Sequence, residues 1–252
     1  MSNKIQIAIS GGLGKMGMLV SNHIHSKKEY EISGIYDPKA KVGSNGIFNN
    51  FQTINDIAAD YIFEFSPADS INNNIMLYKS MDVNLIIGSS GLSDQSKKIL
   101  KNKSKTNLIC VIPNFSIGSA YQKLLSIQLN NHFKNVSIEE SHHKSKKDSP
   151  SGTAIDLAHS LYSSPNLENE MIKDERVEIV NNISILSDRI ESNLSSAYQL
   201  VNFYNPNESI HLEHTVHNRE AYLPGIDIVL NSISKMKKPG YISGLEQFLI
   251  MK

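Results

Sequence analysis

The stretch "ESHHKSKKDSPSGTA", residues 140 to 154, concentrates ionisable side chains directly before residues that are typical of a helix start. It holds two adjacent histidines, three lysines and an aspartate. Histidine titrates near neutral pH, so it suits the donation or acceptance of a proton. The first N–H groups of a helix, here those of Gly152 and Thr153, lack main-chain partners and can bind a carboxylate or a phosphate. We therefore expect this stretch to combine proton donors with an anion-binding helix end.

The two histidines have different surroundings in the predicted strand "VSIEESHH". Side chains alternate between the two faces of a strand, so His142 shares a face with Glu140 and Ile138. His143 points the other way unless the strand has already ended. At most one of the two histidines is therefore expected to face a given cleft. Taken alone, such a run of charges is typical of a solvated surface, and it gains weight only beside a second motif.

The helix that follows has its own expected start. Asp148 or Ser149 can cap it by accepting hydrogen bonds, and Pro150 suits its first turn. Apolar residues at helical spacing predict the buried stripe of this helix, which consists of Ala154, Leu157, Ala158 and Leu161.

A glycine-rich turn near the N-terminus predicts a dinucleotide site. The strand "KIQIAIS" leads into "GGLGKMG", which places Gly12, Gly14 and Gly17 between a strand and a helix. Glycines there permit a positive φ and let main-chain N–H groups approach a pyrophosphate. Asp37 ends the next strand, 20 residues after Gly17, at the place where a carboxylate accepts hydrogen bonds from ribose hydroxyls.

The same carboxylate bears on the choice of cofactor. Asp37 repels a 2′-phosphate and so favours NADH, whereas Lys15 and Lys39 are nearby cations that could partly offset this repulsion. Use of both NADH and NADPH therefore stays open.

Strands and helices alternate over roughly the first 115 residues. The runs "YEISGIYD", "YIFEFS", "VNLIIGSSG" and "NLICVIPN" predict strands, and helical segments are predicted around residues 70–80 and 93–103. This pattern predicts an α/β fold with a Rossmann-like, doubly wound parallel sheet, whose ligands lie beyond the carboxyl ends of the strands. The loops "GSSG" and "IPNFS" end two of these strands, and we expect them where a nicotinamide ring would lie.

The pattern changes after residue 115. A helix, the strand with the two histidines, a second helix and polar β-rich stretches predict a second, α+β domain with a mainly antiparallel sheet over residues 116–218. The tail returns to helical spacing and is expected to pack on the first domain. Residues 1–115 and 219–252 would then bind the dinucleotide, and residues 116–218 the substrate.

Composition argues against several classes of partner and site. The chain carries 25 basic and 25 acidic residues, so it has no overall field to attract nucleic acid or an anionic membrane. A single cysteine, Cys110, precludes an intrachain disulfide and suits a core position in the reducing cytoplasm. No stretch reaches the roughly 18 apolar residues of a membrane span, and no signal-peptide run precedes the first strand, so a cytosolic protein is expected.

Three further motifs receive less weight. His211, His214 and His217 are spaced by three, which on a strand sends the middle one to the opposite face, so no metal site is expected. The Ser-Gly-Thr of the opening stretch lacks the rest of a P-loop. No serine lies in a G-x-S-x-G elbow, which argues against that kind of hydrolase.

Four strings resemble the motifs of one family, the 4-hydroxy-tetrahydrodipicolinate reductases, also called dihydrodipicolinate reductases, of the diaminopimelate and lysine pathway. They are "GLGKMG", "GSSG", "PNFSIG" and above all "ESHHKSKKDSPSGTA". The last is similar to the family signature E-A-H-H-x-x-K-x-D-A-P-S-G-T-A, with serine in place of alanine at Ser141 and Ser149. The order and spacing of the motifs hold from residue 5 to about 160, and more loosely to the end.

The resemblance implies an NAD(P)H-dependent reduction of 4-hydroxy-tetrahydrodipicolinate to tetrahydrodipicolinate with loss of water. It implies that His142 is the proton donor and that Lys146 is a second donor that also contacts substrate. The residues implied to hold the carboxylates of the substrate are His143, Gly152 and Thr153. Those implied to line the cofactor are Gly11, Gly12, Leu13, Gly14, Lys15, Met16, Asp37, Gly88, Ser89, Ser90, Ile112, Pro113, Asn114 and Phe115. Members of the family are usually homotetramers built through the sheet of the second domain.

Two departures from the family pattern bear on these expectations. Pro38 follows Asp37 where many members carry a basic residue, which is one more point toward NADH. The family's later R-x-G-x-x-x-G-x-H string is not recognisable in "SDRIESNLSSAYQL", so Arg189 receives no role.

Two alternatives stay open from the sequence. A related Rossmann oxidoreductase could act on another imino or keto dicarboxylate. A non-catalytic dinucleotide sensor would keep the glycine turn but has no need of His142 and Lys146. Hydride delivered to a conjugated imine leaves negative charge that a nearby acid must quench, and these two residues suit that task.

Overall fold

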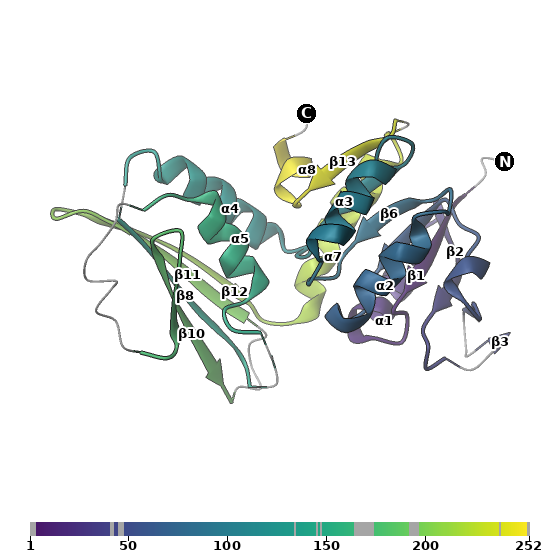
Figure 1. Ribbon diagram of the computed structural model, residues 1–252, viewed down its shortest axis with the longest axis horizontal. Helices are drawn as coiled ribbons and strands as arrows, with labels where there is room; N and C mark the ends of the chain where they lie inside the picture. The colour runs from purple at the N-terminus through teal and green to yellow at the C-terminus, as the bar shows by residue number, and fades with distance from the viewer. Residues whose placement is uncertain are drawn as a thin grey trace. The chain divides into compact units, whose positions relative to one another are not determined.

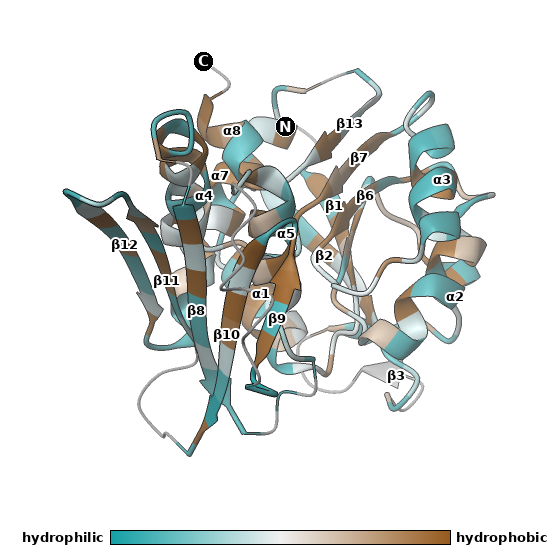
Figure 2. Ribbon diagram, turned by 60° about the vertical axis from the view of Figure 1, so that its left-hand side comes forward, coloured by the Kyte–Doolittle hydropathy of each residue, from teal (hydrophilic) through white to brown (hydrophobic). Residues whose placement is uncertain are grey.

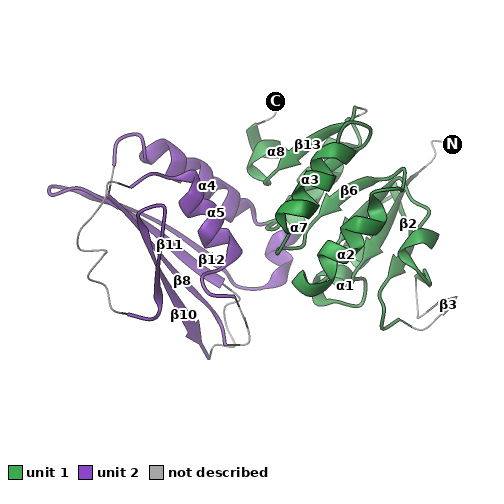
Figure 3. Cartoon of the chain, viewed as in Figure 1, with its two compact units in different colours: residues 1–115, 223–252 green, residues 116–222 purple. Residues whose placement is uncertain are grey.

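The computed structural model describes residues 4–40, 43–44, 48–133, 135–144, 146, 148–163, 174–191, 197–236 and 238–250. The chain divides into two compact units, shown in separate colours in Figure 3. The first consists of residues 1–115 and 223–252, and the second of residues 116–222. The short helix η2, Arg219–Tyr222, groups with the second unit, whereas the sequence pattern placed the return to the first unit at residue 219.

The first unit is built on an eight-stranded sheet in the order β13-β7-β6-β5-β1-β2-β4-β3. Neighbouring strands run parallel except β3 and β4. The strands are β1 Ile5–Ser10, β2 Tyr30–Tyr36, β3 Gly43–Ser44, β4 Asn49–Asn50, β5 Tyr61–Glu64, β6 Asn84–Ile87, β7 Leu108–Val111 and β13 Gly240–Ser243. Because β1 pairs with both β2 and β5, the strand order reverses beside β1, which is where ligands bind in doubly wound sheets. The predicted doubly wound parallel sheet is confirmed.

Helices cover both faces of this sheet. They are α1 Lys15–His25, α2 Ala68–Tyr78, α3 Asp94–Lys103, α7 Leu223–Ile233 and α8 Glu246–Ile250, with the 3-10 helix η1 Ile54–Asp56. Helix α2 packs beside α3, and α1 beside α7 (Figure 1). Right-handed crossovers place α1 on the face opposite to α2 and α3. Every residue of β5 and β7 is buried, as expected for strands covered on both faces.

The second unit holds a five-stranded sheet in the order β12-β11-β8-β10-β9. Its strands are β8 Asn135–His143, β9 Val177–Val180, β10 Ile183–Ile190, β11 Ala197–Tyr204 and β12 Ser209–Val216, and its helices are α4 Ile117–Leu129 and α5 Gly152–Ser160. Among the described strands of this second sheet only β8 and β10 pair in parallel, so the predicted mainly antiparallel sheet is confirmed.

Alternation along β8 shows how the sequence selects one face of this sheet. Val136, Ile138 and Glu140 are buried, whereas the residues between them are partly exposed. Figure 2 shows both brown apolar and teal polar segments on β10, the parallel neighbour of β8. The buried face packs on the apolar stripe of α5, whose predicted members Ala154, Leu157, Ala158 and Leu161 are all buried. Glu140 is therefore a carboxylate placed at an inward position of a core strand.

No helix within the described ranges is both long and apolar enough to span a lipid bilayer. Cys110 lies buried in β7, where burial raises the pKa of its thiol to about 12, so it is a core residue as predicted.

Candidate active site

The glycine turn between β1 and α1 is held by main-chain contacts. Gly11 has φ +74°, and the N–H groups of Gly11 and Gly12 donate to the Tyr36 carbonyl at 2.8 and 3.1 Å. A Cβ added at Gly17 would lie 2.2 Å from the Gly11 carbonyl oxygen. The helix therefore approaches the turn so closely that a side chain does not fit.

The start of α1 is open to an anion. Its N-cap is Gly14, and neither a capping side chain nor an acidic residue in the first turn compensates its N–H groups within the described chain. Helices α3 and α4, by contrast, are capped by the hydroxyls of Ser93 and Ser116. The positive end of the α1 dipole and its free N–H groups fit a dinucleotide pyrophosphate.

Asp37 lies directly beside this turn. Its Oδ2 accepts from the Leu13 N–H at 3.2 Å and its Oδ1 from the Lys39 N–H at 3.0 Å. The main chain thus fixes the carboxylate next to the glycine turn, where the predicted ribose contact requires it.

Three of the predicted cofactor segments meet at the end of β5. Ser89 donates its hydroxyl to the Ser66 carbonyl at 2.6 Å. The ring of Phe65 lies 6.1 Å from that of Phe115, centroid to centroid. A Cβ at Gly88 would lie 2.4 Å from the Phe65 ring, and one at Gly11 would lie 2.7 Å from the Phe65 carbonyl carbon. The glycine turn, "GSSG" and "IPNFS" therefore converge on residues 65–66.

Residues 65–66 were not among the predicted site residues. The signal was present in "FSP", residues 65–67, which directly follows β5 just as the predicted loops follow β1, β6 and β7. In a parallel sheet all strands deliver their following loops to one edge.

The remaining predicted cofactor residues differ in exposure. Ile112 is fully buried, and its N–H donates to the Ile87 carbonyl at 2.8 Å. The other members are partly or largely exposed: Lys15, Met16, Ser90, Pro113 and Asn114.

The end of β8 separates the two histidines as predicted. The strand continues to His143, so His143 faces away from the side that His142 shares with Glu140. The His142 Nε2 lies 3.2 Å from the Glu140 Oε2, and the His142 side chain is 14% exposed. The structure thus joins His142 to a buried carboxylate that the sequence placed only on the same face.

Glu140 is surrounded by donors. Its Oε1 accepts from the Ser151 N–H at 2.7 Å and from the Ser187 hydroxyl at 3.0 Å, and its Oε2 accepts from the Ser151 hydroxyl. Burial alone would raise the pKa of this carboxyl. The hydrogen bonds from His142 and from the side chain and main chain of Ser151 outweigh burial and lower the pKa to about 2. Glu140 is therefore ionised.

Lys146 is paired with the nearby Asp148. Its Nζ donates to both carboxylate oxygens, at 2.8 and 2.7 Å. Partial burial raises the pKa of Asp148, but the hydrogen bond and charge of Lys146, with main-chain N–H groups that include Gly152, outweigh it and lower the pKa. Lys146 and the start of α5 thus already hold one carboxylate.

The expected cap of α5 is wrong. The N-cap is Ser151, whose hydroxyl accepts from the Ala154 N–H at 3.2 Å. Pro150 lies before the cap, after a cis peptide bond from Ser149, and is not in the first turn. Ser151 takes this place because it also donates to Glu140, whereas the carboxylate of Asp148 is engaged by Lys146.

Arg189, to which the sequence assigned no role, lies in the same cluster. It pairs in register with His142 across the parallel strands β10 and β8. Its Nη2 donates to the Asp148 carbonyl, and its Nη1 lies 3.9 Å from the Glu140 Oε1. The parallel pairing is between strands far apart in the sequence, so the local pattern gave no signal for it.

The histidines of "HLEHTVH" do not form one group. His214 contacts the Ser116 hydroxyl at 3.0 Å, whereas His211 contacts the Asn202 side chain at 2.6 Å on the other face of β12. Burial lowers the pKa of His214. The predicted separation of these two histidines on the strand is confirmed.

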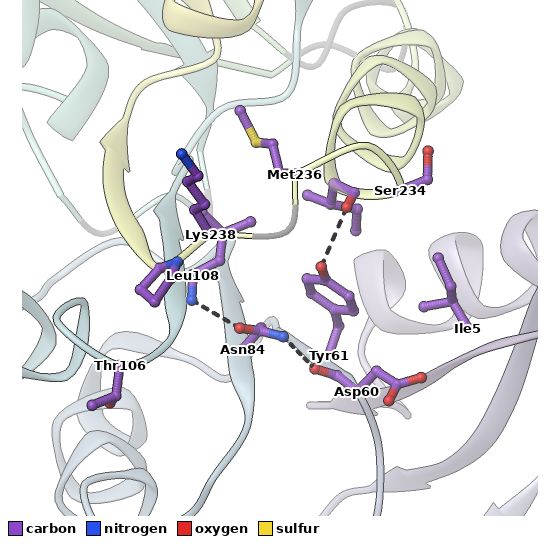
Figure 4. A pocket seen from close by; sticks show the side chains of 11 residues that line it. Ile5, Asp60, Tyr61, Asn84, Thr106, Leu108, Ser234, Met236 and Lys238 are labelled. Atoms are coloured by element: carbon purple, nitrogen blue, oxygen red, sulfur yellow. Dashed lines mark hydrogen bonds between the residues drawn. The ribbon is translucent and has the colours of Figure 1, made fainter.

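A hollow of about 330 Å³ lies at the amino-terminal ends of β5, β6 and β7, the edge opposite to the glycine turn (Figure 4). Asn84 donates to the Asp60 carbonyl at 3.0 Å and accepts from the Leu108 N–H at 2.8 Å. The Tyr61 hydroxyl donates to the Ile233 carbonyl at 3.3 Å. These polar groups hold strand ends and α7 together.

A doubly wound sheet with an uncapped glycine turn, joined to a second unit that carries a histidine, a lysine and a buried glutamate, is typical of a nicotinamide-dependent oxidoreductase. The family description "Dihydrodipicolinate reductase, N-terminus" matches residues 5–115, and "Dihydrodipicolinate reductase, C-terminus" matches residues 118–249. The chain therefore belongs to the dihydrodipicolinate reductase family. The resemblance seen in the motifs, and the class of enzyme it implies, are confirmed.

Individual relatives agree with this assignment. A 4-hydroxy-tetrahydrodipicolinate reductase of Carboxydothermus hydrogenoformans is 32% identical, over 97% of this chain and 99% of its own length. One of Campylobacter jejuni is 27% identical, over 94% and 96%. These matches do not favour the alternative of a sensor or of an oxidoreductase with another substrate.

Solved structures show the same fold. A dipicolinate-bound dihydrodipicolinate reductase from Paenisporosarcina sp. TG-14 superposes with a TM-score of 0.75 and 23% identity, over 99% of this chain and 100% of that one. A myo-inositol dehydrogenase from Corynebacterium glutamicum gives a TM-score of 0.63 at 12% identity, over 92% and 88%. Since the fold serves several substrates, the substrate must be argued from the site.

Proposed function

We propose that the protein reduces 4-hydroxy-tetrahydrodipicolinate to tetrahydrodipicolinate, with loss of water, in diaminopimelate and lysine biosynthesis. Reduced nicotinamide supplies the hydride when it is bound. Beyond family membership, one observation carries the proposal: His142 and Lys146 are both tied, through Glu140 and Asp148, to the start of α5.

In this proposal His142 donates the proton that quenches the charge left by hydride transfer. Lys146 is a second donor and contacts the substrate. Both roles suit groups placed beside an anion-binding helix end, because general acids act only within hydrogen-bond reach of the reacting atom.

The start of α5 and Lys146 would bind a carboxylate of the substrate. Asp148 supports this role, since its carboxylate receives Lys146 and the Gly152 N–H. A Cβ placed on Gly152 meets no atom within 4 Å, so there is room beside this N–H. Thr153 supplies the next N–H, and His143 is a further carboxylate ligand. A dicarboxylate is favoured also because a solved relative is bound to dipicolinate.

The cofactor is NADH in preference to NADPH. Asp37 lies beside the glycine turn, and its charge opposes a 2′-phosphate. Pro38, next in the chain, offers no cation to compensate. The residues predicted to line the cofactor, Gly11 to Met16, Gly88 to Ser90 and Ile112 to Phe115, keep that role in the proposal.

The protein is a cytoplasmic homotetramer that assembles through the second unit. The face of its sheet away from the core carries partly exposed apolar side chains on β10 and β11, the two strands that flank β8: Leu186, Tyr198 and Leu200. Partly exposed apolar side chains on one face of a sheet can mark an interface between subunits. Sedimentation of the purified protein tests this assembly.

The activity is tested with the condensation product of pyruvate and aspartate semialdehyde. Purified protein is expected to oxidise NADH in its presence, and to do so with a higher kcat/KM than with NADPH. Absence of turnover with either nicotinamide would overturn the proposal. Turnover only with another imino or keto dicarboxylate would change the proposed substrate but not the proposed class of reaction.

A further inference from the structure

We propose that Glu140 is a positioning residue that holds His142 by Nε2, so that the proton used in the reaction is carried on Nδ1. This inference rests on the proposed role of His142 as proton donor. It adds a residue to the machinery of the site and assigns the reacting atom of the imidazole.

The charge state of Glu140 decides the hydrogen-bond direction. The Glu140 side chain is 0% exposed and receives the Ser151 N–H, the Ser151 hydroxyl and the Ser187 hydroxyl. The guanidinium of Arg189 lies near the same carboxylate. So many donors around a buried carboxyl stabilise its ionised form, and an ionised carboxylate can only accept hydrogen bonds.

It follows that the His142 Nε2, 3.2 Å from Oε2, must carry a proton and donate it to Glu140. In the neutral imidazole the other nitrogen, Nδ1, is then unprotonated. In the imidazolium the second proton lies on Nδ1. The nitrogen that can gain or lose a proton without breaking the contact with Glu140 is therefore Nδ1.

The proton step balances in this arrangement. Hydride from the reduced nicotinamide brings two electrons to the substrate, and the nicotinamide is oxidised. The Nδ1–H bond of the His142 imidazolium breaks, and its proton goes to the substrate atom that received negative charge. The hydroxyl group of the substrate leaves as water with a proton from the substrate itself, in an elimination that needs no oxidant or reductant. His142 remains neutral with its Nε2–H still donated to Glu140, and solvent restores the proton on Nδ1.

Glu140 also fixes the helix end to which the substrate is proposed to bind. Glu140 accepts from the N–H of Ser151, which is the N-cap of α5 and directly precedes Gly152. One buried carboxylate thus sets the positions of the proton donor and of the anion site relative to each other. Sub-ångström placement of this kind strongly affects rates.

A double-mutant cycle with His142→Gln tests the inference. Glu140→Gln keeps the shape of the side chain but offers an amide donor that favours the other tautomer of His142. We expect kcat to fall by roughly 10²- to 10⁴-fold, as when a catalytic histidine loses its orienting carboxylate. The amide oxygen introduced by this substitution can still accept from the Ser151 N–H and so hold the helix end. The KM for substrate and the Kd for NADH should therefore move by less than about threefold. In the His142→Gln background the same substitution should change kcat by less than about threefold.

The outcomes separate two failures. Additive effects of the two substitutions on kcat would mean that Glu140 does not act through His142, and would overturn the inference. A His142→Gln variant with undiminished kcat would instead refute the proposed proton donor itself. The control is Glu178→Gln, which alters an exposed carboxylate on β9 and should leave kcat unchanged.

A measurement on the unaltered protein keeps the test decisive if Glu140→Gln does not fold. In protein labelled with ¹⁵N at its histidines, two-bond ¹⁵N–¹H correlation spectra report which ring nitrogen is protonated. The His142 signals are assigned by their loss in His142→Gln. In the neutral form of the His142 ring we expect the Nε2–H tautomer, and the Nδ1–H tautomer would contradict the inference.

Discussion

The glycine turn of the first unit and the β8–α5 segment of the second are both connections from a strand to a helix that offer a helix start to an anion, yet they are built in opposite ways. In the first, side chains are removed: a Cβ at Gly17 collides with the main chain, and α1 has no capping side chain among the described residues. In the second, side chains crowd the helix start, with Ser151 as cap and Glu140 behind it.

The difference matches the roles proposed for the two segments, pyrophosphate binding in the first and proton transfer in the second. A pyrophosphate is bound by main-chain N–H groups, whose geometry does not depend on side-chain identity once the glycines are present. A proton transfer needs particular ionisable atoms at fixed positions, so it depends on side chains and on what orients them. The first segment should therefore be sensitive to added volume and the second to altered charge.

The largest expected effect concerns charge in the second segment. Lys146→Ala should lower kcat/KM by roughly 10²- to 10⁴-fold, because it removes a proposed proton donor and carboxylate contact. Binding of NADH, measured by fluorescence titration, should not change. The control is Lys144→Ala, which removes an exposed lysine paired with Glu191 and should alter kcat/KM by less than about twofold. Equal effects of the two substitutions would contradict the charge-specific role.

Acid should lower the free energy of unfolding of the protein, because Glu140 in the second segment becomes protonated. Its folded-state pKa of about 2 lies below its ordinary value of 4.5. The stabilisation is therefore complete above about pH 4.5 and is lost as the pH falls toward about 2; it is on the order of 3 kcal/mol. In denaturant titrations the stability gap between the unaltered protein and Glu140→Gln should narrow between about pH 6 and about pH 3. A gap that stays constant over this range would disprove the assignment.

Added volume distinguishes the two helix starts. Gly17→Ala should weaken NADH binding by roughly 10- to 100-fold, since strain of about 1–3 kcal/mol must be relieved by moving the turn. Gly152→Ala places its methyl group in open space and should leave the melting temperature and the Kd for NADH nearly unchanged. Similar losses of NADH affinity in both variants would contradict the proposed difference between the starts of α1 and α5.

The smallest effect is expected at the edge of the first segment. Asp37→Ser removes the charge that opposes a 2′-phosphate, so the ratio of kcat/KM for NADPH to that for NADH should rise by about tenfold. Steady-state rates with the two cofactors measure this ratio. An unchanged ratio would show that cofactor choice lies elsewhere.

The sequence predicted what local patterns determine. The glycine turn, Asp37 at the end of β2 and the buried stripe of α5 all follow from spacing within one element or one connection. The face of β8 shared by His142 and Glu140 follows from alternation alone.

What the sequence could not predict depends on pairings between distant segments. Arg189 enters the site only because β10 runs parallel to β8 in a particular register. The choice of Ser151 as cap, rather than Asp148, depends on Glu140 and Lys146 acting together. Several residues near one helix start can cap it, and tertiary partners decide among them.

Asp148 gives the second unit a built-in competitor. In the proposed complex an incoming carboxylate takes over contacts that a tethered carboxylate already makes with Lys146 and Gly152. A tethered group has a high effective concentration, so a simple monocarboxylate gains little by displacing it. A dicarboxylate can add a second contact that Asp148 does not make. Competition from Asp148 would thereby reduce the binding of small monocarboxylic acids to the site.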